Sequence, residues 1–189
     1  IKDSVAFLRI VNQKNDDLAF ERIINVPKRS IGESTVKQIY DWGRANKQSL
    51  EDSAYILLQK NKIKPKAKIA LMSILKLFDK WRLDLKEKKH YELMEIILDE
   101  SGYSKMLKDK KDLESEGRLE NLKELIRGMR DFDNLQSFLE HVALATSIDQ
   151  DWDGEKVNLM TMHAAKGLEF DAVFLPGWEE GLFPHQKSL

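Results

Sequence analysis

Apolar residues recur at intervals of three and four along most of the chain, from the first residue to about Ser147. This spacing puts apolar side chains on one face of successive helices, so it predicts a largely helical region. The longest face starts at Pro65 and predicts a central packing helix. Its apolar positions are Leu71, Ile74, Leu75, Phe78, Trp81 and Leu85.

Residues suited to helix ends divide this region into shorter helices. Pro27 should stop the second helix, because proline cannot continue one. Ser49 is placed to cap the N-terminus of a helix over residues 50–58. Gly102 should close the helix that contains residues 93–98 by adopting the left-handed conformation.

The pattern changes after Lys156. Val157, Leu159 and Thr161 alternate with their neighbours, and this period of two predicts a strand. A second strand is predicted at residues 172–175, and the loop between the two strands is rich in polar residues. Ligands of α/β sheets usually bind at such strand ends. The predicted fold is therefore mainly α, with a short strand-loop-strand piece of an α/β domain at the C-terminus.

Composition narrows the classes of function. The 189 residues include no cysteine, which excludes disulfides, thiol nucleophiles and thiolate zinc sites. The four histidines show no paired metal-ligand spacing, so we expect no metal site. No run approaches the roughly 20 apolar residues of a membrane span, and the first residues do not resemble a signal peptide. We therefore expect a cytoplasmic protein without a membrane partner.

Charge is nearly balanced, with 31 basic and 32 acidic residues, so bulk electrostatics do not indicate a nucleic-acid binder. Locally, lysines occupy every second position from Lys60 to Lys68. In an extended loop they would share one side, which would face either phosphate or solvent. Residues 149–155 form an acidic connector.

Two stretches near the C-terminus carry a family resemblance. Residues 161–170 read Thr-Met-His-Ala-Ala-Lys-Gly-Leu-Glu-Phe, and residues 178–185 read Trp-Glu-Glu-Gly-Leu-Phe-Pro-His. The first resembles motif V of superfamily 1 helicases, and the second resembles the UvrD/Rep/PcrA group of DNA helicases. Further stretches resemble that group in the same order, so the resemblance covers the whole chain: residues 1–3, 15–25, 119–125 and 135–141.

The resemblance implies a division into three parts. Residues 1–11 would end the first half of the RecA-like domain 2A, residues 12–155 would form the helical subdomain 2B, and residues 156–189 would begin the second half of 2A. In motif V it assigns Thr161, His163 and Lys166 to single-stranded DNA. It assigns Gly167 and Glu169 to the nucleotide. For Lys166, a solvated surface lysine remains an alternative.

A second site lies in the hairpin of residues 27–35, where amide groups near Gly32 are open to a phosphate oxygen. It resembles the helix-hairpin-helix element by which 2B grips duplex DNA. Ser30 stands where the family has a glycine. Ser30 and Glu33 also fit a capping box, so a purely structural turn remains an alternative. The implied duplex contacts are Lys28, Arg29, Ser30, Ile31, Gly32, Thr35 and Lys37.

The chain lacks a G-x-x-x-x-G-K-[ST] phosphate loop, and Asp99 and Glu100 follow a helical pattern, not a buried strand. The family's arginine-bearing motif VI is also absent. We therefore expect no ATP hydrolysis by this chain alone. The resemblance implies a parent enzyme that uses ATP and Mg²⁺ to unwind DNA from 3′ to 5′ in a bacterial cytoplasm, associated with the nucleoid.

The implied partners are duplex and single-stranded DNA at a junction, the helicase subdomains 1A, 1B and 2A, and repair proteins. DNA would be bound without sequence preference, because backbone contacts carry no sequence information. The alternative is a helical protein-interaction module that does not bind DNA directly. Near-neutral net charge favours that alternative.

Overall fold

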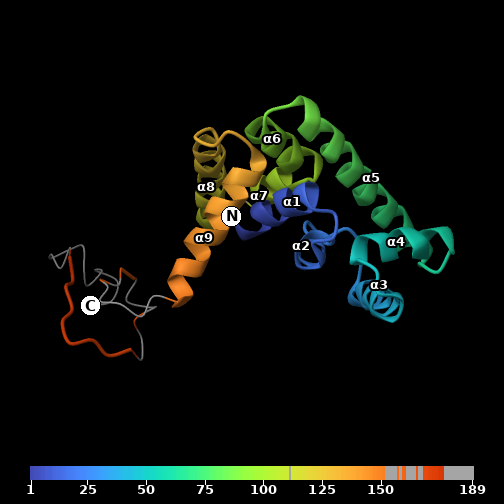
Figure 1. The fold of residues 1–189 in the computed structure, drawn as a ribbon, viewed down its shortest axis with the longest axis horizontal. Coiled ribbons are helices and arrows are strands. Elements are labelled where there is room, and N and C mark those ends of the chain that lie inside the picture. The colour runs from blue at the N-terminus through green and yellow to red at the C-terminus, as the bar shows by residue number, and fades with distance from the viewer. Residues whose placement is uncertain (111, 152–156, 158, 161–164, 166–167, 177–189) are drawn as a thin grey trace. The chain divides into compact units, whose positions relative to one another are not determined.

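The computed structural model describes residues 1–110, 112–151, 157, 159–160, 165 and 168–176. The chain divides into two compact units, Ile1–Gln150 and Asp151–Leu189. The described residues form nine helices (Figure 1). They are α1 (Lys2–Asn12), α2 (Asp17–Ile23), α3 (Glu33–Asn46), α4 (Leu50–Gln59), α5 (Pro65–Glu87), α6 (His90–Glu100), α7 (Tyr103–Lys110), α8 (Leu113–Met129) and α9 (Leu135–Asp151).

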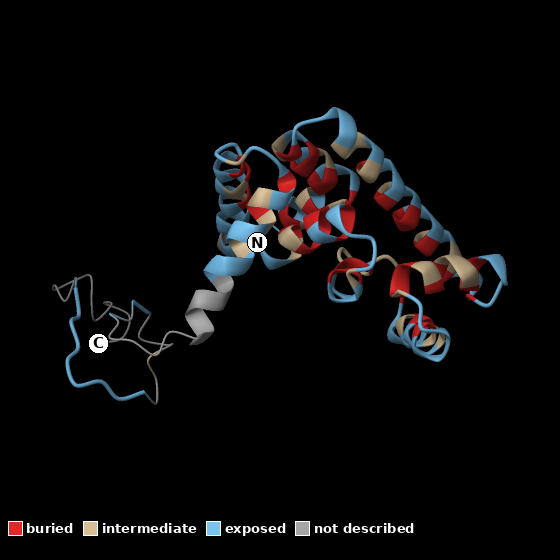
Figure 2. Cartoon of the chain, viewed as in Figure 1, coloured by how far each residue is buried: buried red, intermediate tan, exposed pale blue. Residues whose placement is uncertain are grey.

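The predicted central helix is confirmed. α5 begins at Pro65, where the missing N–H costs no hydrogen bond, and it runs for 23 residues. Its buried face carries Leu71, Ile74, Leu75, Phe78 and Trp81, as the spacing predicted. Figure 2 shows buried positions along the inner side of α5 and on the helices that it faces.

Aromatic side chains join α1, α2 and α5 in the core. Phe7 packs edge-on against Trp81, with ring centroids 6.0 Å apart, and Phe20 packs against Phe78 at 6.3 Å. Phe78 and Trp81 lie 5.9 Å apart along α5. All four side chains are almost completely buried, so α1 is a central element of the helical unit.

Two of the predicted helix ends are confirmed. The Ser49 side chain accepts a hydrogen bond from the Asp52 N–H at 3.2 Å, and Gly102 has a φ of 77°. α2, however, ends at Ile23, earlier than predicted from Pro27. The residue before a proline disfavours the α conformation, so the chain leaves the helix before Val26.

The predicted strand at residues 172–175 is not confirmed, because the described residues after Asp151 include no strand. A strand needs a hydrogen-bonded neighbour and a covered apolar face. Val173 and Phe174 are instead 63% and 90% exposed. In the first predicted strand, residues 157, 159 and 160 are described and belong to no strand, and residues 158 and 161 lie outside the described residues. α9 extends to Asp151, so the acidic connector begins as helix.

Candidate nucleic-acid interface

The hairpin between α2 and α3 leaves backbone donors open at the start of α3. Gly32 is the N-cap residue, and no side chain caps the helix there. The Gly32 carbonyl accepts from the N–H groups of Thr35 and Val36, at 2.9 and 3.2 Å. Within the described part of the chain, the N–H groups of Glu33 and Ser34 have no acceptor. Such free amides at a helix start can bind a phosphate oxygen.

Asn25 shapes the loop that leads to this helix start. Its Oδ1 accepts from the N–H of Arg29 at 2.7 Å and from that of Ile31 at 3.4 Å. The Ile31 side chain is buried and anchors the loop. Sequence reasoning missed Asn25, although an asparagine side chain that bonds to the backbone of a following turn is a known turn signal.

Ser30 adopts the left-handed conformation, with a φ of 65°. The capping-box alternative is therefore wrong, because the cap residue is Gly32 and the Ser30 side chain makes no cap. Glycine reaches the left-handed region without a steric penalty, which fits the glycine that the resemblance implies at this position. The loop nevertheless takes this shape with serine.

Arg29 braces the hairpin. Its Nη1 donates to the carbonyls of Ile23 and Pro27, at 3.3 and 3.0 Å. Its Nη2 donates to the carbonyl of Ser101 at 2.8 Å, which ties the hairpin to the end of α6. Burial lowers the pKa of Arg29 to about 10. Arg29 thus has a structural role that the sequence did not reveal.

The remaining implied duplex contacts fall into two groups. The exposed residues can meet a ligand directly, whereas the buried ones shape the hairpin. Lys28, Ser30, Gly32 and Lys37 are exposed. Ile31 and Thr35 are buried, at 1% and 6% exposure.

The lysines from Lys60 to Lys68 do not line one side of an extended loop, so that expectation is wrong. Pro65 begins α5, and Lys66 and Lys68 therefore follow helical geometry. Lys68 Nζ donates to Asn61 Oδ1 at 2.6 Å. This segment lies beside α3, since Gln38 Nε2 donates to the Lys62 carbonyl at 3.1 Å.

Positive charge is concentrated around these two loops. Residues 24–68, here called the basic lobe, contain ten basic and four acidic residues. The other residues of the chain contain 21 basic and 28 acidic residues. In Figure 1, α3 and α4 lie at the opposite end of the helical unit from α8 and α9. The near-zero net charge therefore hides a polar distribution that favours an anionic ligand at one end.

Most of the segment that resembles motif V, residues 161–170, lies outside the residues that the structure describes. Thr161, His163, Lys166 and Gly167 lie outside the described residues, and their assignments stay predictions. Glu169 is described and exposed.

The acidic pair Asp99 and Glu100 ends α6, which confirms its helical setting. Glu100 accepts from Trp81 Nε1 at 2.8 Å and pairs with Lys80, so it serves to hold α5 and α6 together.

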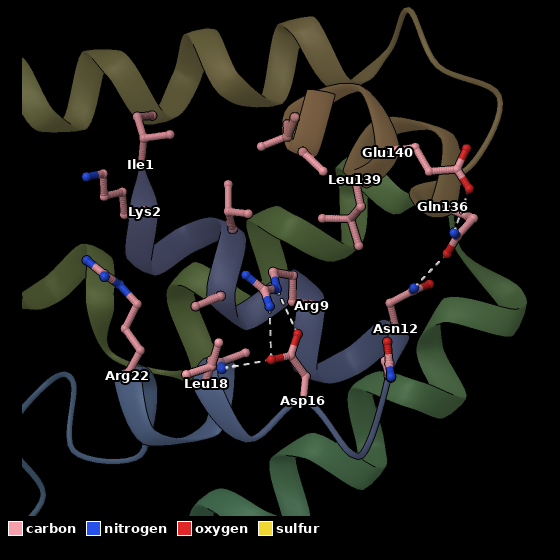
Figure 3. A pocket seen from close by; sticks show the side chains of 16 residues that line it. Ile1, Lys2, Arg9, Asn12, Asp16, Leu18, Arg22, Gln136, Leu139 and Glu140 are labelled. Carbon is pink, nitrogen blue, oxygen red and sulfur yellow. Dashed lines mark hydrogen bonds and ion pairs between the residues drawn. The ribbon is translucent and has the colours of Figure 1, made fainter. Parts of the chain in front are cut away.

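A groove of about 890 Å³ lies between α1, α2 and the first turns of α9 (Figure 3). Arg9 pairs with Asp16 in this groove at 2.7 Å, and Asn12 Nδ2 donates to Gln136 Oε1 at 2.8 Å. Leu139 adds an apolar wall.

No group of histidine and carboxylate side chains able to hold a metal occurs among the residues that the structure describes.

Among the residues that the structure describes, no helix combines the length and the apolar character that a membrane span requires.

Comparison with known proteins gives a consistent result. The family model described as the UvrD-like helicase C-terminal domain matches residues 1–189. A probable DNA helicase II homolog of Rickettsia conorii is 41% identical over 194 residues. DNA helicase II of Escherichia coli and the ATP-dependent DNA helicase PcrA of Staphylococcus aureus are each 36% identical, over 199 and 204 residues.

Each match covers 100% of this chain but only 29%, 28% and 27% of these three relatives, respectively. The chain thus spans less than a third of their length. Because the family model matches every residue, the chain belongs to the UvrD-like helicase C-terminal domain family.

Proposed function

We propose that this chain is the 2B region, with adjoining parts of 2A, of an ATP-dependent 3′-to-5′ DNA helicase, and that its basic lobe grips duplex DNA. The names of the relatives support the helicase assignment. The observation that carries the DNA role is the concentration of positive charge around a hairpin whose helix-start amides are open. Both features suit phosphate.

In this proposal the hairpin contacts the DNA backbone. The N–H groups of Glu33 and Ser34 would donate to a phosphate oxygen, and the exposed Lys28 and Lys37 would add charge on either side. Arg29 would hold the loop in shape from behind. Since none of these groups reads a base edge, binding should be independent of sequence.

The nucleotide would be shared with parts of the enzyme outside this chain. Glu169 is exposed, so its carboxylate is open to accept a ribose hydroxyl. The chain has no phosphate loop, so residues elsewhere would hold the phosphates and Mg²⁺ of ATP. Thr161, His163 and Lys166 would contact single-stranded DNA, and Gly167 would lie with Glu169 at the nucleotide, where the tight turn of Lys166 and Gly167 brings the two ligands close together.

A second candidate function is protein binding by the helical unit. Ile69 and Met72 on α5 are 73% and 39% exposed and lie three residues apart on one side of the helix, and such an exposed apolar pair favours a docking surface for a protein. Salt dependence separates the two candidates. Counterion release weakens DNA binding as salt rises, whereas an apolar contact lacks this dependence.

Fluorescence anisotropy of a labelled duplex with a 3′ single-stranded tail tests the DNA role. We expect salt-sensitive binding, and the Lys28→Gln and Lys37→Gln variants should each reduce the salt slope by about one. Lys123→Gln on α8 is the matched control, because it removes the same charge from an exposed pair with Glu120. Equal losses in all three variants, or no binding at low salt, would contradict the proposal.

A further inference from the structure

A buried ion pair joins α4 to α5. Glu51 of α4 is 0% exposed, and the Arg82 side chain of α5 is 19% exposed. Two hydrogen bonds connect them, Nη1 to Oε1 at 2.7 Å and Nη2 to Oε2 at 2.5 Å. A two-pronged contact between planar groups fixes their relative orientation as well as their distance.

Arg82 also reaches a third helix. Its Nη2 donates to the Ile10 carbonyl at 2.9 Å, in the last turn of α1. Carbonyls in the last turn of a helix have no partner within that helix, so Arg82 satisfies one that would otherwise be unpaired. One guanidinium therefore holds α1, α4 and α5 together.

Further polar contacts continue along α4. The Tyr55 hydroxyl donates to Asp79 of α5 at 2.5 Å, and Lys14 pairs with Asp52 at 2.7 Å. α3 packs against α4. The direction in which α4 leaves α1 and α5 therefore sets the position of α3, and with it the start of the hairpin helix.

Stability alone does not account for the Glu51–Arg82 pair. The pair carries a desolvation cost, because burial raises the pKa of the Glu51 carboxyl even though hydrogen bonds from Arg82 act in the opposite sense, and burial also opposes the raising of the Arg82 pKa by Glu51. Apolar side chains of similar volume often replace such pairs without loss of stability. A buried pair can instead select one geometry among several packed arrangements.

We propose that Arg82 is a positioning residue for DNA binding. By holding Glu51 and the end of α1 at once, it fixes the angle at which α4, with α3 packed against it, stands on α1 and α5. This inference rests on the proposed function for its consequence, but its geometric part can be measured without DNA.

The geometric test uses spin labels on exposed residues of α3 and α6. Ala45→Cys and Glu95→Cys provide unique sites, because the chain has no cysteine of its own. Pulsed electron paramagnetic resonance should give a narrow distribution of distances between the two labels in the protein that keeps Arg82. The Arg82→Gln variant should give a broader or shifted distribution. The paired replacement Glu51→Leu with Arg82→Met should fold stably and also broaden the distribution. An unchanged distribution in both backgrounds would overturn the proposal.

The functional test measures binding of the tailed duplex, at a temperature where circular dichroism shows each variant to be folded. Arg82→Gln and the paired apolar replacement should weaken binding about five-fold, comparable to the loss of one phosphate contact. Arg127→Gln, which breaks the exposed pair with Glu124 on α8, is the control and should bind like wild type.

Failure of the two proposals is distinguishable. If the wild-type chain does not bind DNA, the proposed function fails, while the label distances still report on Arg82. If the wild type binds and the folded Arg82 variants bind equally well, the positioning role is wrong.

Discussion

At the scale of single residues, Ser30 holds backbone strain in the hairpin, since its φ of 65° lies in the left-handed region. A side chain with a Cβ pays about 1 kcal/mol or more in that region, and glycine does not. Hydrogen bonds from Asn25 and the buried Ile31 fix the loop around it. The strain is therefore tolerated because neighbouring residues determine the conformation.

Ser30→Gly should therefore stabilise the chain by about 0.5–1 kcal/mol, the relief of strain less the added flexibility of the unfolded state. Urea unfolding measures the change. Ser34→Gly is the matched control, because Ser34 lies in the first turn of α3, where glycine weakens a helix. Destabilisation by both variants would show that Ser30 carries no strain.

Arg29→Gln should destabilise the chain by about 1–3 kcal/mol, because the carbonyls of Pro27 and Ser101 lose a buried donor. Arg29→Lys should recover little of this loss, since one ammonium group cannot reproduce the fork of a guanidinium. Arg44→Gln, at an exposed position of α3, should stay close to wild type in the same denaturant titration. Equal stability of Arg29→Gln and wild type would contradict the bracing role.

At the scale of helices, α1 belongs to the core. Phe7 contacts Trp81 of α5 and Tyr103 of α7, with ring centroids 6.0 and 6.2 Å apart. α1 also lies in the compact unit Ile1–Gln150. The domain boundary that the family resemblance puts after residue 11 stays a prediction. α1 nevertheless packs against α5 and α7, which follow that boundary in the sequence.

Phe7→Ala should cost about 3–5 kcal/mol of folding free energy, because it leaves a cavity among three helices. Leu83→Ala is the comparison, since Leu83 is 63% exposed and its loss should change stability by less than about 0.5 kcal/mol. Thermal and urea unfolding should agree on the difference. Similar small effects in both variants would mean that α1 is not part of the cooperative core.

Tyr103 links α7 to α1 in a way that depends on pH. Its hydroxyl donates to Asp3 at 3.0 Å, and burial together with the Asp3 charge raises the pKa of Tyr103 to about 12. The folded pKa lies above the ordinary value of about 10. The stability that the Tyr103–Asp3 hydrogen bond adds to the folded chain is therefore complete below pH 10, and it is lost as the pH rises toward 12.

The difference in the free energy of unfolding between wild type and Tyr103→Phe should therefore be constant up to about pH 10. Above that pH the wild type should lose stability relative to the variant. Urea unfolding between pH 8 and 11 gives this difference directly. A difference that stays constant throughout would show that Tyr103 ionises alike in the folded and unfolded chains.

At the scale of the whole molecule, the sequence predicted local features well and distant contacts poorly. The buried face of α5 and the Ser49 cap follow from spacing within one helix. Arg29 donates a hydrogen bond to the carbonyl of Ser101, which lies 72 residues further along the chain, and no local pattern in the sequence predicts that contact. The strand predicted at residues 172–175 is not confirmed, because a short apolar run in the sequence does not show whether a neighbouring strand is present to pair with it.

The same limit applies to charge. Alternation from Lys60 to Lys68 indicated an extended row, whereas Pro65 starts a helix there. The excess of basic residues over 24–68 can be counted in the sequence, but only the structure shows that the lysine-rich segment lies beside α3. Net charge, which favoured a protein-binding module, averages the basic lobe with a remainder of the chain that has more acidic than basic residues.

Replacing Lys60, Lys62 and Lys64 together by glutamine tests whether this local charge drives DNA binding. If the lysines face the phosphates near the hairpin, the salt slope should fall by about three. A second triple variant removes the same charge from α7, by replacing Lys105, Lys108 and Lys110, which are exposed. If net charge controlled binding, the two triple variants would weaken it equally. A loss confined to the first variant assigns the DNA contact to the basic lobe, because only the position of the charge differs between them.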